Sequence, residues 1–66
     1  MQIQLNGEPN QFDGEPTLTQ LIDSLGLAGR RIAIEVNEEI VPRSQHAQTR
    51  LNDGDRVEIV HAIGGG

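Results

Sequence analysis

The residues best suited to chemistry are the three glycines at the end of the sequence, Gly64, Gly65 and Gly66. They directly follow a run with the pattern of a buried strand, so a free α-carboxylate would end a tether without side chains. Because glycine has no Cβ, such a tether passes through narrow channels and adopts backbone angles closed to other residues. The pattern favours a carboxylate that a partner enzyme draws into its own active site. The alternative is a frayed chain end or an expression remnant, because disorder concentrates at termini.

Few other residues have the spacing of a catalytic or metal site. The sequence has no cysteine, and neither His46 nor His61 has a further ligand at metal spacing, so we expect no metal centre. Two acidic pairs, at 38–39 and 53–55, occur in turn-like sequence, where solvated carboxylates are common. The sequence contains no phosphate-binding loop and no Ser-His-Asp arrangement.

Length and charge narrow the class of partner. The 66 residues include ten acidic residues, five arginines and no lysine, which gives a formal net charge of -5. This negative charge argues against nucleic acid as a partner, because the phosphates of nucleic acid require a basic protein surface. Basic proteins are more plausible partners. A chain this short buries only about 60% of its unfolded surface, so there is little room for an internal active site. Without a signal peptide or a long apolar run, we expect no membrane association and a cytoplasmic location.

The first part of the sequence predicts a β-hairpin. Residues 1–5 alternate polar and apolar, as in a half-buried strand. The dipeptide Asn6-Gly7 is a strong signal for a two-residue hairpin turn. We therefore expect a second strand over about 10–13, with Phe12 as its core anchor.

A helix is predicted to follow the hairpin. Thr17 and Gln20 have the spacing of a capping box, and Gly26 suits the C-terminal stop. Between them, four apolar residues recur at helical spacing and form one stripe that would pack on a sheet. They are Leu18, Leu21, Ile22 and Leu25.

Three more strands are predicted after the helix. Residues 32–36 alternate, the Asn37-Glu38 turn leads to a short strand over 39–41, and 43–50 is a loop or short helical turn. After a turn over 52–55, a last strand runs from Val57 to Ile63. Its expected inward residues are Val57, Ile59, His61 and Ile63. This order predicts an α+β fold in which a mixed sheet of about five strands packs on one main helix.

The order of elements and the glycine end resemble the ubiquitin-like β-grasp fold. Four stretches, 33–37, 40–43, 51–60 and 62–66, are similar to the ThiS family, the sulfur carriers of thiamine biosynthesis. The resemblance covers essentially the whole chain and implies one β-grasp domain over 1–66 with a flexible tail over 63–66. The related small subunit of molybdopterin synthase often carries prolines before its terminal glycines, whereas this sequence has His61-Ala62-Ile63.

The resemblance implies a carrier that other enzymes act on, without a bound cofactor of its own. A ThiF-type adenylating enzyme, using ATP and Mg²⁺, would convert the Gly66 carboxylate to an acyl-adenylate. A sulfurtransferase persulfide would displace AMP and leave a thiocarboxylate on Gly66, a 1-thioglycine. This sulfur would pass to a ThiG-type thiazole synthase, while Gly64 and Gly65 thread the tail into each active site.

A recognition surface is predicted on the last strand. Its expected partner-binding residues are Ile63, Ala62, Val60 and Glu58, together with Ile40 from the preceding hairpin. The alternative is that Ile40 packs inward and that Val60 is only a good strand former. Other functions also stay open at this point: sulfur carriage for molybdopterin or tRNA thiolation, a ubiquitin-like modifier joined to lysine, and a passive interaction module.

Overall fold

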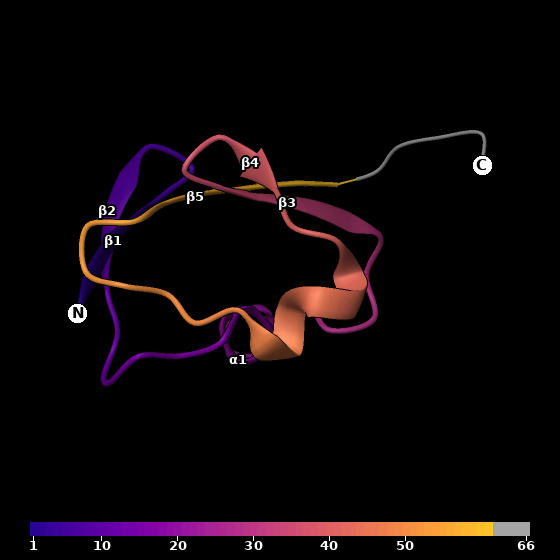
Figure 1. Ribbon diagram of the computed structural model, residues 1–66, viewed down its shortest axis with the longest axis horizontal. Coiled ribbons are helices and arrows are strands. Elements are labelled where there is room, and N and C mark those ends of the chain that lie inside the picture. The colour runs from indigo at the N-terminus through magenta and orange to yellow at the C-terminus, as the bar shows by residue number, and fades with distance from the viewer. Residues whose placement is uncertain (62–66) are drawn as a thin grey trace.

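The computed structural model describes residues 1–61, which form five strands, one α-helix and one 3₁₀ helix (Figure 1). The elements are β1 (Gln2–Leu5), β2 (Glu8–Gln11), α1 (Leu18–Ser24), β3 (Ile32–Val36), β4 (Glu39–Ile40), the 3₁₀ helix η1 (Arg43–Gln48) and β5 (Arg56–His61). The sheet has the order β2-β1-β5-β3-β4. Strands β1 and β5 are parallel and the other neighbours are antiparallel, so the sheet is mixed, as predicted.

Both hairpins turn on two residues with positive φ. These are Asn6 and Gly7, with φ of 50° and 83°, and Asn37 and Glu38, with φ of 52° and 71°. Such turns join two antiparallel strands directly, and Glu8 already pairs with Leu5. The prediction of a second strand over 10–13 was therefore two residues too late.

The helix begins and ends where its capping residues predict. The Thr17 Oγ1 accepts a hydrogen bond from the Gln20 N–H (3.2 Å), and the Gln20 Oε1 accepts one from the Thr17 N–H (2.9 Å). Gly26, with φ of 72°, follows the C-cap. The C-cap is Leu25, which is 36% exposed, so its predicted place in the apolar stripe was wrong. The buried stripe ends at Ile22, three positions before the C-cap.

The core lies between the sheet and a layer formed by α1 and η1, which lie on the same side of the sheet (Figure 1). Its most buried side chains come from all parts of the chain: Ile3, Leu18, Leu21, Ile22, Ile34, Leu51, Val57 and Ile59. Phe12, the predicted core anchor, is only partly buried and packs at the edge of this cluster.

The segment around η1 contributes two buried residues that sequence reasoning did not assign to the core. Leu51 is fully buried because the chain after η1 pairs with the chain before α1, through hydrogen bonds from Leu18 N to Thr49 O and from Leu51 N to Pro16 O, both 2.9 Å. His46 is 7% exposed, and its Nε2–H donates to the Val41 carbonyl at 3.0 Å. Because a carbonyl only accepts, this contact fixes the proton on Nε2.

Candidate functional site

The central strand β5 leads directly towards the glycine end of the sequence. It pairs with β1 on one side and with β3 on the other, and its Val57 and Ile59 side chains are buried in the core. Its last residue, His61, pairs with Ile32 and lies on the same face of β5 as Val57 and Ile59, as predicted, but its side chain is exposed. β5 ends at this exposed residue, and Figure 1 shows the strand running along the sheet towards the C-terminal end.

Five of the predicted site residues lie outside the described residues. They are Ala62 and Ile63, predicted to bind a partner, Gly64 and Gly65, predicted to thread the tail, and Gly66, predicted to be modified. Their roles stay predictions from the sequence. The rest of the site is the strand that leads to them and the face of the sheet around it.

The remaining predicted residues share the face of the sheet that points away from the helices. Ile40 and Val60 are 69% and 59% exposed, and Glu58 is exposed as well. The alternative in which Ile40 packs inward is therefore wrong. The register places Ala33 opposite Val60, and Glu35 between Ile40 and Glu58. We call these five residues, Ala33, Glu35, Ile40, Glu58 and Val60, the outer patch.

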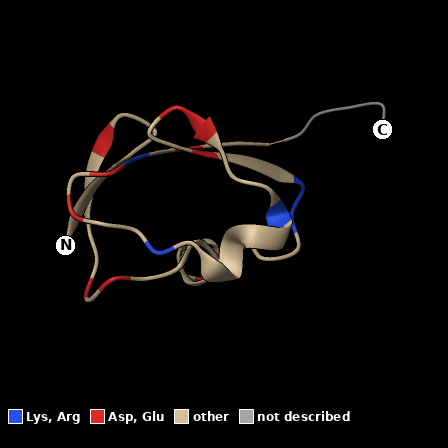
Figure 2. Ribbon diagram, in the orientation of Figure 1, with Lys and Arg blue, Asp and Glu red and all other residues tan. Residues whose placement is uncertain are grey.

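Sequence reasoning missed two members of the outer patch, Ala33 and Glu35, and of these Glu35 carries a charge. It stands directly opposite Glu58 in the antiparallel β3–β5 pair. Both residues occupy outward positions in alternating strands, which is visible in the sequence, but their pairing depends on the register. Figure 2 shows the acidic segments that β4 and the neighbouring strands bring together in this part of the sheet.

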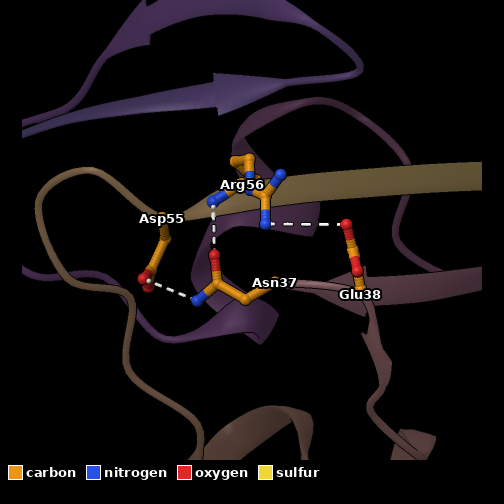
Figure 3. Close-up of polar contacts among 4 residues, drawn as sticks. All are labelled: Asn37, Glu38, Asp55 and Arg56. Carbon is orange, nitrogen blue, oxygen red and sulfur yellow. Dashed lines mark hydrogen bonds and ion pairs between the residues drawn. The ribbon is translucent and has the colours of Figure 1, made fainter.

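Polar contacts hold the beginning of β5 beside the second hairpin turn (Figure 3). The Asn37 side chain accepts from the Arg56 N–H and donates to Asp55 Oδ1, both at 3.0 Å. The Arg56 guanidinium lies 3.6 Å from the Glu38 carboxylate, with both side chains largely exposed. The turn and the strand entry are thereby fixed relative to each other, and the Arg56 charge is directed towards the turn.

Two concave surfaces of the described chain lie on the side of the helices. One groove lies between the end of α1, the loop before β3 and η1, and its rim includes Arg30 and Arg43. The Arg43 guanidinium donates to the Arg30 carbonyl at 3.0 Å. Within residues 1–61, no three His, Cys, Asp or Glu side chains are grouped closely enough to hold a metal ion. No helix in this part of the chain is long and apolar enough to span a membrane.

Comparison with known proteins decides the family. The model of the ThiS family matches residues 3–66. The chain belongs to the ThiS family. The sulfur carrier protein ThiS of Escherichia coli is 35% identical over 66 residues, which cover all of both chains. A crystal structure of the thiamine biosynthesis protein ThiS from Geobacter metallireducens is 33% identical, covers all of both chains and superposes with a TM-score of 0.88.

Two further relatives are longer than this chain and carry another name. A thiazole synthase of Paramagnetospirillum magneticum is 47% identical over all 66 residues, and one of Magnetococcus marinus is 41% identical. The chain spans only 20% of the length of each. The ThiS structures confirm the ubiquitin-like β-grasp fold, and the family match confirms the predicted resemblance to the ThiS sulfur carriers.

Proposed function

We propose that this chain is a sulfur carrier of thiamine biosynthesis, which other enzymes act on in the cytoplasm. The observation that carries this proposal is the end-to-end match to the ThiS sulfur carrier of Escherichia coli, in a sequence that ends with Gly64, Gly65 and Gly66. The geometry supports it, because the strand that precedes the glycines is the central strand of the sheet. A rigid strand gives the reactive end a defined starting point.

The proposed chemistry takes place on the Gly66 carboxylate. One carboxylate oxygen attacks the α-phosphate of ATP, and pyrophosphate leaves to give an acyl-adenylate. A sulfurtransferase persulfide then attacks the acyl carbon, and AMP leaves. A second thiol then attacks the cysteine sulfur of the sulfurtransferase in the resulting acyl disulfide, so the S–S bond breaks, a new disulfide forms on the sulfurtransferase side and a thiocarboxylate leaves on Gly66. A carboxylate is a poor electrophile, which is why activation must precede sulfur transfer.

Other proteins supply the catalytic groups in this proposal. A ThiF-type adenylating enzyme binds ATP together with Mg²⁺. The Mg²⁺ stabilises the charge that develops on the phosphates of ATP. This chain supplies the carboxylate, the narrow glycine tether at 64–65 and a docking surface that includes Ile63, Ala62, Val60, Glu58 and Ile40. The thiocarboxylate is a stronger acid than a thiol and is ionised at neutral pH, so it needs no base from this chain.

A ThiG-type thiazole synthase is the proposed recipient of the sulfur. The similarity of this chain to one fifth of two thiazole synthases supports that link, because carrier-like sequence and the synthase name occur together in those proteins. The sulfur then enters the thiazole ring of thiamine.

Intact mass spectrometry tests the proposal. The chain is incubated with ATP, Mg²⁺, a ThiF-type enzyme and a persulfide donor, with a variant that lacks Gly65 and Gly66 as control. We expect the full chain to gain the mass difference between one sulfur and one oxygen, and this change should map to Gly66. The shortened control should keep its mass. An unchanged mass, with partners active on another ThiS carrier, would reject the proposal. Thiocarboxylation by a molybdopterin-type activating enzyme alone would reject the assignment to thiamine.

A further inference from the structure

The groove between the end of α1, the loop before β3 and η1 combines an apolar lining with exposed charges. Its apolar side chains are buried or half-buried: Ile22, Leu27 and Ile32. The exposed residues Arg30 and Arg43 line it as well, together with Asp23. Two arginines and one aspartate give this lining a net formal charge of +1, in a chain whose formal net charge is -5. We call this surface the arginine groove, and its charge favours an anion.

The two arginines of the groove are available to bind a carboxylate. The Arg43 guanidinium donates to the Arg30 carbonyl at 3.0 Å, which joins η1 to the loop before β3. A hydrogen bond from the Arg30 N–H to the Leu27 carbonyl, also at 3.0 Å, closes that loop. A guanidinium has five N–H donors in a planar fork, so Arg43 keeps donors for a second acceptor. In the described part of the chain, the Arg30 guanidinium and the Asp23 carboxylate have no hydrogen bond or ion pair.

The arginine groove lies beside the point where β5 ends. Ile32, which lines the groove, pairs with His61, the last residue of β5. Neighbouring strands are about 4.8 Å apart, so the chain leaves the sheet next to the groove. Figure 2 shows in blue the arginine segments at the start of β3 and of η1, at this same end of the sheet. The sequence continues from His61 for residues 62–66.

We propose that residues 62–66 of the free chain fold back over the arginine groove, so that the Gly66 carboxylate binds the guanidinium groups of Arg30 and Arg43. This inference deepens the proposed function and rests on it, because only a chain that ends at Gly66 carries this carboxylate. An extended chain from His61 to Gly66 reaches about 17 Å, roughly three times the spacing of neighbouring strands. The carboxylate can therefore reach the groove without any change in the fold. Exposed ion pairs are weak, so a partner enzyme can withdraw the tail again.

Size, charge and tethering favour the chain's own tail as the occupant. The groove has a volume of about 270 Å³, which is below the roughly 300–1,000 Å³ of typical small-molecule pockets. Glycines add no side chains that would need more room. The single negative charge of the carboxylate matches the net charge of the groove. A short flexible tether also gives the carboxylate a millimolar effective concentration, which the tail of a second copy lacks in dilute solution.

The same contact would protect the product of sulfur transfer. A thiocarboxylate on Gly66 also carries one negative charge, so it can bind the same two arginines. An anion that is stabilised in this way is a weaker nucleophile. The bound sulfur should therefore react more slowly with stray electrophiles until a partner withdraws the tail.

NMR spectroscopy of the unmodified chain tests the contact without any partner enzyme. A chain with Gly66 as the carboxamide keeps every residue and loses only the terminal charge. Compared with the carboxylate form, it should show shifted amide signals at 28–31 and a shifted Arg43 side-chain Nε–H signal. Both shifts should also depend on salt, because salt screens exposed ion pairs.

Arg30→Gln tests the contact from the side of the groove. Its side chain has no contact to lose in the described part of the chain, so the fold should be kept. The heteronuclear NOE of the Gly65 and Gly66 amides should fall, because the tail is released. Alkylation of the thiocarboxylated variant by iodoacetamide should be faster by up to about fivefold, the factor that an exposed ion pair supplies. Arg50→Gln is the matched control, because it removes one positive charge from a residue outside the groove.

Three results would overturn the inference. The first is a carboxamide chain whose groove signals match those of the carboxylate form. The second is an Arg30→Gln chain whose tail mobility equals that of Arg50→Gln. The third is a set of groove shifts that appear only at high protein concentration, because the groove would then bind the tail of a second copy.

Mass spectrometry of the wild type separates this inference from the proposed function. A wild type that gains sulfur but shows no NMR contact between tail and groove loses only the fold-back. A wild type that gains no sulfur from active partners rejects the proposed function, and with it the protective role of the groove.

Discussion

The side chain of Asn6 forms two hydrogen bonds with the main chain of Ile59, although 53 positions separate them. Its Oδ1 accepts from the Ile59 N–H at 2.8 Å, and its Nδ2 donates to the Ile59 carbonyl at 3.2 Å. These contacts continue the β1–β5 pairing beyond its last main-chain pair, Leu5 with Val57. The first hairpin turn therefore holds the middle of the strand that leads to the glycine end.

The variant Asn6→Gly tests this contact. Glycine accepts the φ of 50° but makes neither side-chain hydrogen bond. We expect the free energy of unfolding in urea to fall by about 1–3 kcal/mol, because a net hydrogen bond contributes about 0.5–1.5 kcal/mol. Asn6→Ala should lose roughly 1 kcal/mol more, because its Cβ is strained at positive φ. A glycine variant as stable as the wild type would show that the side-chain contacts contribute nothing.

Leu51 is expected to be one of the most sensitive core positions. Its side chain is 0% exposed, under the layer formed by α1 and η1. Truncation by Leu51→Ala should lower the free energy of unfolding by about 2–5 kcal/mol, the usual range for a buried leucine. That loss is a large fraction of the total stability of a small domain. The control Ile40→Ala removes a branched apolar side chain from an exposed site, and thermal unfolding should separate the two variants clearly.

The two hairpin turns differ at their second residue, and this difference predicts a stabilising substitution. The first turn has Gly7 there, whereas the second has Glu38 at φ 71°. Glu38→Gly should raise the free energy of unfolding by up to about 1 kcal/mol, because glycine is unstrained at positive φ. The variant loses the exposed 3.6 Å contact with Arg56, which contributes little.

Glu38→Gln is the control for that experiment. It removes the ion pair but keeps a side chain at positive φ, so its stability should stay within about 0.5 kcal/mol of the wild type. Urea unfolding measures both variants. If Glu38→Gly were the less stable of the two, the ion pair would outweigh the backbone strain.

Local signals made part of the fold predictable. The capping box of Thr17 and Gln20 and the stop at Gly26 place the helix ends correctly because each involves residues only a few positions apart. The Asn6-Gly7 turn was equally clear. The second strand was nevertheless predicted two residues too late. A two-residue turn lets the next strand begin at once, so Glu8 already pairs with Leu5.

Features that depend on distant pairing were not predictable in the same way. Leu51 stands in a polar stretch without helix or strand periodicity, and only its pairing with the chain before α1 makes it core. The opposition of Glu35 and Glu58 needs the β3–β5 register, which no pattern within either strand specifies. The outward positions of Val60 and Glu58 did follow from alternation within β5, and this much of the candidate site was predicted.

The last prediction concerns Gly65, whose role rests on the sequence and the proposed function. Gly65→Ala adds one methyl group to the tether that should pass through a narrow channel of the adenylating enzyme. We expect kcat/KM for pyrophosphate release to fall on the order of tenfold or more, because a Cβ clashes with a channel shaped for glycine. Stability should change by less than about 0.5 kcal/mol.

Ser44→Thr provides the matched control, because it adds one methyl group to an exposed residue of η1. It should leave both the unfolding curve and pyrophosphate release unchanged. If Gly65→Ala were adenylated as fast as the wild type, the tether would need no narrow channel. The terminal glycines would then serve reach alone, and a longer tail with small side chains should work equally well.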